Sequence, residues 1–387
     1  MKAANSAPDQ AASRWRDRAL IGLFAVLLLV PLLDMAFHLD PTKPQSENRL
    51  LAAFPSRPQN IGGVKKFMAG WEAYFNDHFG CRRCLVMWHN KLMWSLFEDK
   101  NARNVLVGPD GWFFISEPWM IEHFRGAMQF TDAQLHDWQK LLEHRRDWLA
   151  QRGIKYVFVI APEKYTIYPE HLPVWLKDLG GRTKSDQFYA YMKAHSTVEV
   201  LDLRPMLSAA KKTTPVYLKT DTHWNELGAF LASEELVRAL GEHQLPELAP
   251  LSLDSFDLTH RLTAGGDLVN IRGIRISMAE SNAFFLTPKP SLPVLETFIP
   301  TGEHVMDQAT AKNPRGHGLA MVYTDSFGRG WISFLSYQFG EADFFWQYHL
   351  NGPLIERRKP VVVVNEMVER FFNVMDPMEL FAKDALP

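Results

Sequence analysis

The chain has 387 residues, of which 47% are hydrophobic and 22% charged, and its formal net charge is −2. This near-neutral balance excludes the strongly basic surfaces that bind nucleic acid. The length exceeds one minimal domain, so we expect a substantial core with an appended segment.

The N-terminal segment predicts a membrane anchor. Several arginines precede an apolar run over residues 19–39, which a single aspartate interrupts. A membrane helix needs about 20 apolar residues, and basic residues mark its cytoplasmic side. We therefore expect a cytoplasmic tail at 1–18, an uncleaved anchor at 19–39 and export of the remainder. A cleaved signal peptide is the alternative, although no small-x-small cleavage site follows the run.

A linker and a helical segment are expected over residues 40–100. The first part is rich in proline and polar residues, and helical spacing of apolar residues follows from Val64 to about Phe97. Cys81 and Cys84 form the motif "CRRC" and would be able to form a disulfide outside the cytoplasm. A zinc site is disfavoured, because one straight helix cannot surround an ion with four ligands.

Residues 101–387 predict an α/β domain. A hairpin is indicated around the Pro-Asp-Gly of "NVLVGPDGWFFIS", and a helix from Thr131 to Arg152. Four continuous apolar runs read as buried strands, namely "IKYVFVIAP", "VEVLDLRP", "HGLAMVYTDSFG" and "KPVVVVNEMVERFF". Helical segments lie between them, so we expect a parallel sheet with helices on both faces.

The segment "YTDSFG" contains a candidate nucleophile. Ser326 follows a predicted strand, at the carboxyl edge where open α/β sheets carry their functional residues. A serine at such a turn exposes its hydroxyl, and the backbone N–H of Phe327 would then face a developing oxyanion. The alternative is that Asp325 and Ser326 only cap the next helix.

The segment "KTDTHWNELGA" offers a base for that serine. Asp221 would orient one ring nitrogen of His223 and leave the other free to accept a proton from Ser326. The alternatives are simple capping of the following helix and a metal site, for which no third ligand motif is evident. Lys164 and Asn225 are candidate substrate contacts, with a solvated loop residue as the alternative for Lys164. Asp267, in the turn "GGDL", is expected to be structural.

Together these segments resemble the SGNH-hydrolase-like acetyltransferases of bacterial exopolysaccharide modification, the alginate O-acetyltransferase group. The matching pieces span residues 47–372 in the family's order and include "ENRLLAAFP", "WEAYFNDHFGCRRCLVMWHNKL", "VLVGPDGWFF", "APEKYTIYPEHLP", "VYLKTDTHWNELGA", "GGDL", "YTDSFG" and "VVNEMVERFF". The resemblance implies a three-layer SGNH-like (flavodoxin-like) fold and a triad of Asp221, His223 and Ser326. One departure is Thr-Asp-Ser-Phe-Gly at the serine, where alginate members carry a Gly-Thr-Ser-Tyr-Ser type of motif.

The resemblance implies a periplasmic O-acetyltransferase anchored in the bacterial inner membrane. It would move an acetyl group through an acylated serine onto an exported polysaccharide, without a metal or diffusible cofactor. A multispanning membrane-bound O-acyltransferase would supply the acetyl group, because acetyl-CoA is absent outside the cytoplasm. A carbohydrate acetylesterase with the same triad and a non-catalytic polysaccharide-binding scaffold remain the alternatives.

Overall fold

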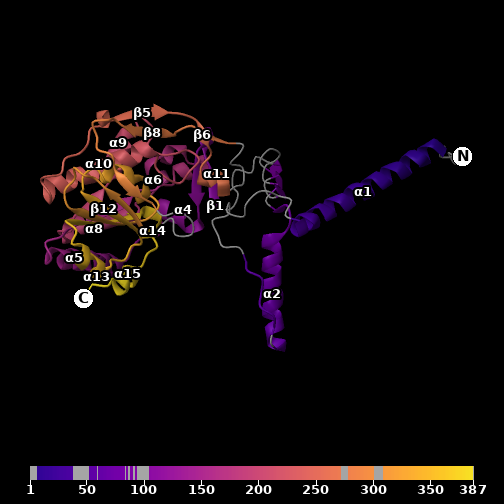
Figure 1. Cartoon of the computed structure of the whole chain (residues 1–387), viewed down its shortest axis with the longest axis horizontal. Helices are drawn as coiled ribbons and strands as arrows, with labels where there is room; N and C mark the ends of the chain where they lie inside the picture. The colour runs from indigo at the N-terminus through magenta and orange to yellow at the C-terminus, as the bar shows by residue number, and fades with distance from the viewer. Residues whose placement is uncertain are drawn as a thin grey trace. The chain divides into compact units, whose positions relative to one another are not determined.

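The computed structural model describes residues 7–37, 52–58, 60–82, 84–85, 88–89, 92–93, 104–271, 278–299 and 308–386. The chain divides into two compact units, 1–99 and 100–387, and each is described by itself (Figure 1). The start of the predicted linker, from residue 40, and the end of the predicted helical segment, toward Phe97, lie outside the described residues.

The first unit contains the long apolar helix α1 (Ala7–Phe37). An 18-residue stretch within Arg14–Phe37 has a mean hydropathy of 2.5, and this part of the helix is long and apolar enough to cross a membrane. Only 11% of this stretch is buried inside the protein, whereas most of a core helix in a soluble protein would be buried. A helix thus covers the predicted anchor as far as Phe37.

The second helix of this unit, α2 (Ile61–His78), begins at a side-chain cap. Asn60 Oδ1 accepts a hydrogen bond from the Gly63 amide at 2.8 Å, which satisfies one of the free N–H groups at the helix start. Cys81 and Cys84 follow this helix, and neither forms a disulfide bond. The disulfide that the sequence leaves open is therefore not formed in this structure.

The second unit is built on a seven-stranded sheet with the order β4-β3-β13-β11-β12-β10-β9. The first five strands run parallel, and β10 and β9 are added antiparallel at one edge. Their bounds are Lys155–Ala161 (β3), Val200–Asp202 (β4), Glu296–Phe298 (β9), Gln308–Lys312 (β10), Leu319–Thr324 (β11), Glu341–Trp346 (β12) and Val362–Val368 (β13).

Both faces of this sheet are buried, which explains the continuous apolar runs in its strands. In β13, Val362 and Val364 belong to one hydrophobic core, and Val363 and Met367 belong to the other. Successive side chains of a strand point to opposite faces, so a strand between two cores is apolar at most of its positions.

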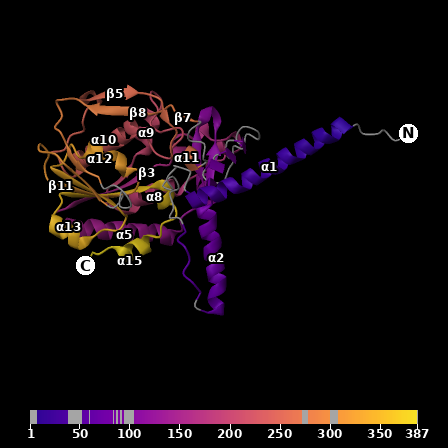
Figure 2. The same cartoon turned by 45° about the vertical axis from the view of Figure 1, so that its right-hand side comes forward.

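Helices form a layer on each face of the sheet (Figure 2). The core on one side includes residues from α9 (Arg204–Ala210), α10 (Glu226–His243) and α12 (Ile332–Leu335). The core on the other side includes residues from α5 (Asp132–Ala150), α8 (Lys184–His195), α13 (Gly352–Arg358) and α15 (Pro377–Lys383). The predicted three-layer α/β architecture is therefore confirmed.

Smaller elements complete the unit. The hairpin β1–β2 turns at Asp110 and Gly111, which both adopt positive φ (56° and 75°), as Pro-Asp-Gly predicts. The remaining strands are Asn104–Val107 (β1), Phe113–Ser116 (β2), Phe256–His260 (β5), Thr263–Ala264 (β6), Ala279–Glu280 (β7) and Phe284–Pro288 (β8). The remaining α-helices are Pro118–Phe124 (α4), Lys164–Ile167 (α6), Val174–Lys177 (α7), Asp267–Ile271 (α11) and Glu369–Phe372 (α14).

Candidate active site

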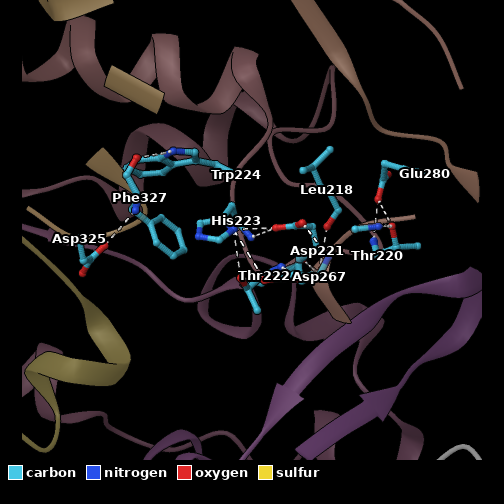
Figure 3. Close-up of polar contacts among 12 residues, drawn as sticks. Leu218, Thr220, Asp221, Thr222, His223, Trp224, Asp267, Glu280, Asp325 and Phe327 are labelled. Carbon is cyan, nitrogen blue, oxygen red and sulfur yellow. Dashed lines mark hydrogen bonds and ion pairs between the residues drawn. The ribbon is translucent and has the colours of Figure 1, made fainter. Parts of the chain in front are cut away.

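Asp221 and His223 form a hydrogen-bonded pair in the loop before α10. Asp221 Oδ1 lies 2.6 Å from His223 Nδ1 and also accepts a hydrogen bond from the His223 amide at 3.1 Å (Figure 3). Burial acts to raise the pKa of the Asp221 carboxyl, but the hydrogen bond and charge of His223 outweigh it and lower that pKa to about 2. The carboxylate is therefore ionised at neutral pH and able to hold the imidazole in one orientation.

Asp267 holds the residue between the two members of this pair. Its carboxylate accepts hydrogen bonds from the Thr222 amide at 2.8 Å and from the Thr222 hydroxyl at 2.6 Å. The Asp267 amide in turn donates to Asp221 Oδ2 at 2.9 Å. Burial and the charge of Asp221 raise the pKa of Asp267. The structural role expected for Asp267 thus includes direct support of Asp221.

The start of the same loop is fixed by Glu280 on β7. Its carboxylate accepts hydrogen bonds from the Lys219 amide at 3.0 Å, the Thr220 amide at 2.7 Å and the Thr220 hydroxyl at 2.6 Å. Thr220 Oγ1 also accepts from the Gly266 amide at 2.9 Å. Glu280 has no distinguishing sequence motif around it, so only its place in the fold identifies it.

The turn that carries Ser326 follows β11 directly. Asp325 shapes it, because its Oδ1 accepts from the Phe327 amide at 2.9 Å and its Oδ2 accepts from the Val368 amide at 2.8 Å and the Tyr348 hydroxyl at 2.6 Å. Asp325 is 3% exposed, so these bonds anchor the turn to β13 inside the protein.

A second buried carboxyl group supports this turn from β13. Glu366 Oε2 accepts from the Thr324 hydroxyl at 2.5 Å and from the Asp325 amide at 3.2 Å. Burial, together with the charge of Asp325, raises the pKa of Glu366 well above its ordinary value.

The loop and the turn meet at Phe327. The rings of His223 and Phe327 have centroids 4.9 Å apart, and the Trp224 indole N–H donates to the Phe327 carbonyl at 3.2 Å (Figure 3). His223 Nε2 is buried and has no hydrogen-bond partner among the described residues. The structure thus brings His223 against the residue next to Ser326, but a His223–Ser326 hydrogen bond is not formed, and the complete triad stays a prediction.

The backbone amide predicted for an oxyanion hole is occupied. The Phe327 N–H donates to Asp325 Oδ1, within the same turn. An oxyanion would have to displace that carboxylate, so the role assigned to this amide remains a prediction that requires the turn to rearrange.

Lys164 and Asn225 lie in positions that differ from the substrate contacts expected from the sequence. Lys164 is 2% exposed, and its Nζ donates to three backbone carbonyls of the loop. Asn225 is also 2% exposed and caps α10, where its Oδ1 accepts from the Gly228 amide at 2.9 Å. Both polar groups are thus committed to the fold and are turned away from solvent.

Three side chains here lie close enough to hold a metal ion in principle. Ligand atoms of Asp221, His223 and Asp267 all lie within 4.8 Å of one another. The carboxylate oxygens of Asp221 and Asp267, however, accept the hydrogen bonds described above from His223, Thr222 and the Asp267 amide. The donor set therefore fits a hydrogen-bonded acid–imidazole pair better than a coordination site.

Asp267→Asn is expected to lower the rate of acetyl-ester turnover by on the order of tenfold to 100-fold, because its amide cannot accept both Thr222 hydrogen bonds and Asp221 would shift. The effect should fall on kcat, with KM nearly unchanged. Asp257→Asn, at an exposed position on β5, is the control and should behave as the wild type. Equal kcat values for the two variants would exclude the support role of Asp267.

Part of this unit is similar in sequence to known proteins. Residues 105–279 match the family model described as SGNH hydrolase-like domain, acetyltransferase AlgX, a range that includes Asp221, His223 and Asp267 but ends before Ser326. The protein named "Probable alginate O-acetylase AlgJ" from Pseudomonas aeruginosa is 30% identical over 184 residues, which cover 46% of this chain and 44% of that protein. The chain therefore spans less than half the length of this relative.

Two solved structures share the fold. A DHHW family protein from Eubacterium siraeum matches with a TM-score of 0.54 and 15% identity over 74% of this chain and 97% of that one. Bacillus cereus PatB1 with a sulfonyl adduct matches with a TM-score of 0.53 and 14% identity over 72% of this chain and 99% of that one. Residues 105–279 of the chain are thus similar to SGNH hydrolase-like acetyltransferase domains.

Proposed function

We propose that the protein is an O-acetyltransferase that acetylates hydroxyl groups of an exported polysaccharide through an acetylated Ser326. The observation that carries this proposal is the state of His223. Its Nδ1 is held by Asp221, while its Nε2 is buried next to the turn that bears Ser326 and has no hydrogen-bond partner in the described part of the chain. A buried ring nitrogen without a hydrogen-bond partner is uncommon. A role for Nε2 as the general base that accepts the Ser326 hydroxyl proton explains this one.

In the first half-reaction, Ser326 Oγ attacks the acetyl carbonyl carbon of the donor and His223 Nε2 takes the hydroxyl proton. The tetrahedral intermediate collapses, the bond to the donor oxygen breaks, and the imidazolium returns the proton to that leaving group. Asp221 stays ionised throughout and stabilises the imidazolium. The products are acetyl-Ser326 and the deacetylated donor.

In the second half-reaction, a sugar hydroxyl attacks the acetyl-Ser326 carbonyl carbon while His223 Nε2 takes its proton. Collapse of this second intermediate breaks the bond to Ser326 Oγ, which recovers the proton from His223. The reaction as proposed uses no cofactor. Transfer outcompetes hydrolysis only if the acceptor hydroxyl is held in place of water.

The setting of the reaction is part of the proposal. The helix at Arg14–Phe37 supports a membrane anchor, and the AlgJ-named relatives support a catalytic unit on the periplasmic side of the bacterial inner membrane. The acceptor would be an exopolysaccharide, with alginate as one candidate because of those names. A membrane-bound O-acyltransferase would supply the acetyl group.

The test is to trap the acetylated enzyme. The full chain in detergent is incubated with 4-nitrophenyl acetate, and the modified peptide is found by mass spectrometry, with and without polysaccharide fragments. We expect one acetyl group on Ser326, none on that peptide in Ser326→Ala, and acetylated sugar when the acceptor is present. Ser291→Ala, at an exposed serine, is the matched control.

The other outcomes separate the alternatives. Acetate release at the same rate with and without sugar, and no acetylated sugar, would identify an acetylesterase. Failure to label Ser326, combined with binding of polysaccharide fragments, would identify a scaffold. Either result would overturn the transferase proposal.

A further inference from the structure

We infer that Lys164 is a positioning residue for the Asp221–His223 pair, because its buried ammonium group gathers the backbone carbonyls of the loop that carries the pair. Lys164 Nζ donates to the carbonyls of Leu218 at 3.0 Å, Lys219 at 3.1 Å and Asp221 at 2.5 Å. An ammonium group has three donors, and all three are used. This inference rests on the proposed function for its catalytic consequence, but not for its geometry.

The three carbonyls converge only because a cation lies between them. Carbonyl oxygens that point at one spot repel each other, and a loop with that shape needs a compact positive charge at its centre. Lys164 is 2% exposed, so water cannot take the place of its donors without opening the core. Burying the ammonium group is costly, and the carbonyls offset that cost as a hydrogen-bonded cage.

Nearby carboxylates further offset the cost of burying the Lys164 ammonium group. Burial lowers the pKa of Lys164 to about 8, against the opposing charges of Asp221, Asp267, Glu280 and Glu163. The aromatic rings of Trp112 and Phe114 also lie near the ammonium group, with centroids 5.8 and 5.4 Å from Nζ. The ammonium thus lies among the carboxylates that shape the site.

Lys164 connects this loop to the rigid centre of the sheet. It follows β3 closely and opens α6. The preceding residue, Glu163, is fixed to α14, which directly follows β13, because its amide donates to Glu369 Oε2 at 2.8 Å and its carboxylate pairs with Arg370 at 2.6 Å. The loop therefore takes its position from two central strands through one side chain.

The protonation state of Lys164 should determine how firmly its side chain holds the loop that carries the Asp221–His223 pair. The neutral amine has two donors for three carbonyls, so we expect kcat to fall as the pH rises through about 8, the pKa of Lys164. Stability should change in the opposite direction. The folded-state pKa lies below the ordinary value of 10.5, so the unfolded chain binds the proton more tightly, and this residue's contribution to stability rises with pH between about 8 and 10.5.

The experiment compares Lys164→Met with Lys211→Met in the full chain. Lys211 is a matched control, since its Nζ also donates to a backbone carbonyl, that of Ile167, and pairs with the Glu170 carboxylate. Acetyl-ester turnover gives kcat and KM, and proton NMR reports the deshielded Nδ1–H of His223. For Lys164→Met we expect kcat about 100-fold lower, KM nearly unchanged and the Nδ1–H signal lost. Lys211→Met should keep all three.

A second variant covers the case in which Lys164→Met does not fold. Lys164→Cys, in a background with Cys81→Ser and Cys84→Ser, is alkylated under denaturing conditions and refolded. Aminoethylation of the cysteine restores a side chain with an ammonium group, whose pKa is lower than that of lysine. Ethylation restores a side chain of similar volume without the ammonium group. We expect the aminoethylated protein to regain kcat and the His223 Nδ1–H signal, and its kcat to begin falling at a lower pH than in the wild type. The ethylated protein should regain neither kcat nor the signal.

Two results would overturn the inference: a folded Lys164→Met with wild-type kcat and an intact His223 signal, or equal recovery of activity by the ethylated protein. If the proposed function is wrong but the inference about Lys164 is right, the experiments should give a different set of results. Ser326 would then not be acetylated, while Lys164→Met would still lose the His223 signal.

Discussion

Replacing His223 by alanine should reduce acetyl transfer by at least about 10³-fold in kcat, because its imidazole is the group proposed to take the proton of the Ser326 hydroxyl. Asp221 would then lose the partner that keeps its pKa near 2. The fold should remain, since His223 is partly exposed and its ring is not part of either hydrophobic core.

The measurement is the rate of Ser326 acetylation by an acetyl ester, followed by mass spectrometry. His243→Ala is a matched control, because His243 Nδ1 also pairs with a carboxylate, Glu199 Oε2 at 3.0 Å, but on the surface. Its rate should equal that of the wild type. Comparable rates for His223→Ala and His243→Ala would remove His223 from the mechanism.

Gly266→Ala should damage both the fold of the site and the reaction. A Cβ atom at residue 266 would lie 2.4 Å from Asp221 Cβ and 2.6 Å from Asp221 Oδ2, well inside contact distance. Asp221 or the "GGDL" turn would have to move. We expect a loss of about 1–3 kcal/mol in the free energy of unfolding, typical of overpacking, and a kcat on the order of 100-fold lower.

Thermal or chemical unfolding and ester turnover measure these two effects. Gly340→Ala is the comparison, because a Cβ atom there would lie 3.2 Å from the carbonyl oxygen of Gly316, a tight but adjustable contact. We expect a smaller loss of stability and unchanged turnover. A Gly266→Ala protein with wild-type turnover would show that Asp221 tolerates displacement, which contradicts the triad geometry.

Four of the five parallel strands were predictable, whereas β12 and the antiparallel strands at the edge of the sheet were not. β3, β11 and β13 are apolar at nearly every position, and this pattern follows from burial on both faces. β12 and β10 carry acidic and polar residues such as Asp343 and Thr310, which hydrogen bond to each other at 2.8 Å. Such residues interrupt the apolar run, so the sequence alone does not mark these strands.

The sequence by itself determined the membrane-type helix, the three-layer α/β architecture and the candidacy of Asp221, His223 and Ser326. These depend on local patterns, namely hydrophobic periodicity and short motifs at strand ends. Only the tertiary structure decided that Asp267, Glu280 and Lys164 hold the Asp221 loop. Their hydrogen bonds join residues between 45 and 61 positions apart in the chain. The tertiary structure also placed Lys164 inside the protein, because whether a lysine meets solvent or buried carbonyls depends on how distant segments pack around it.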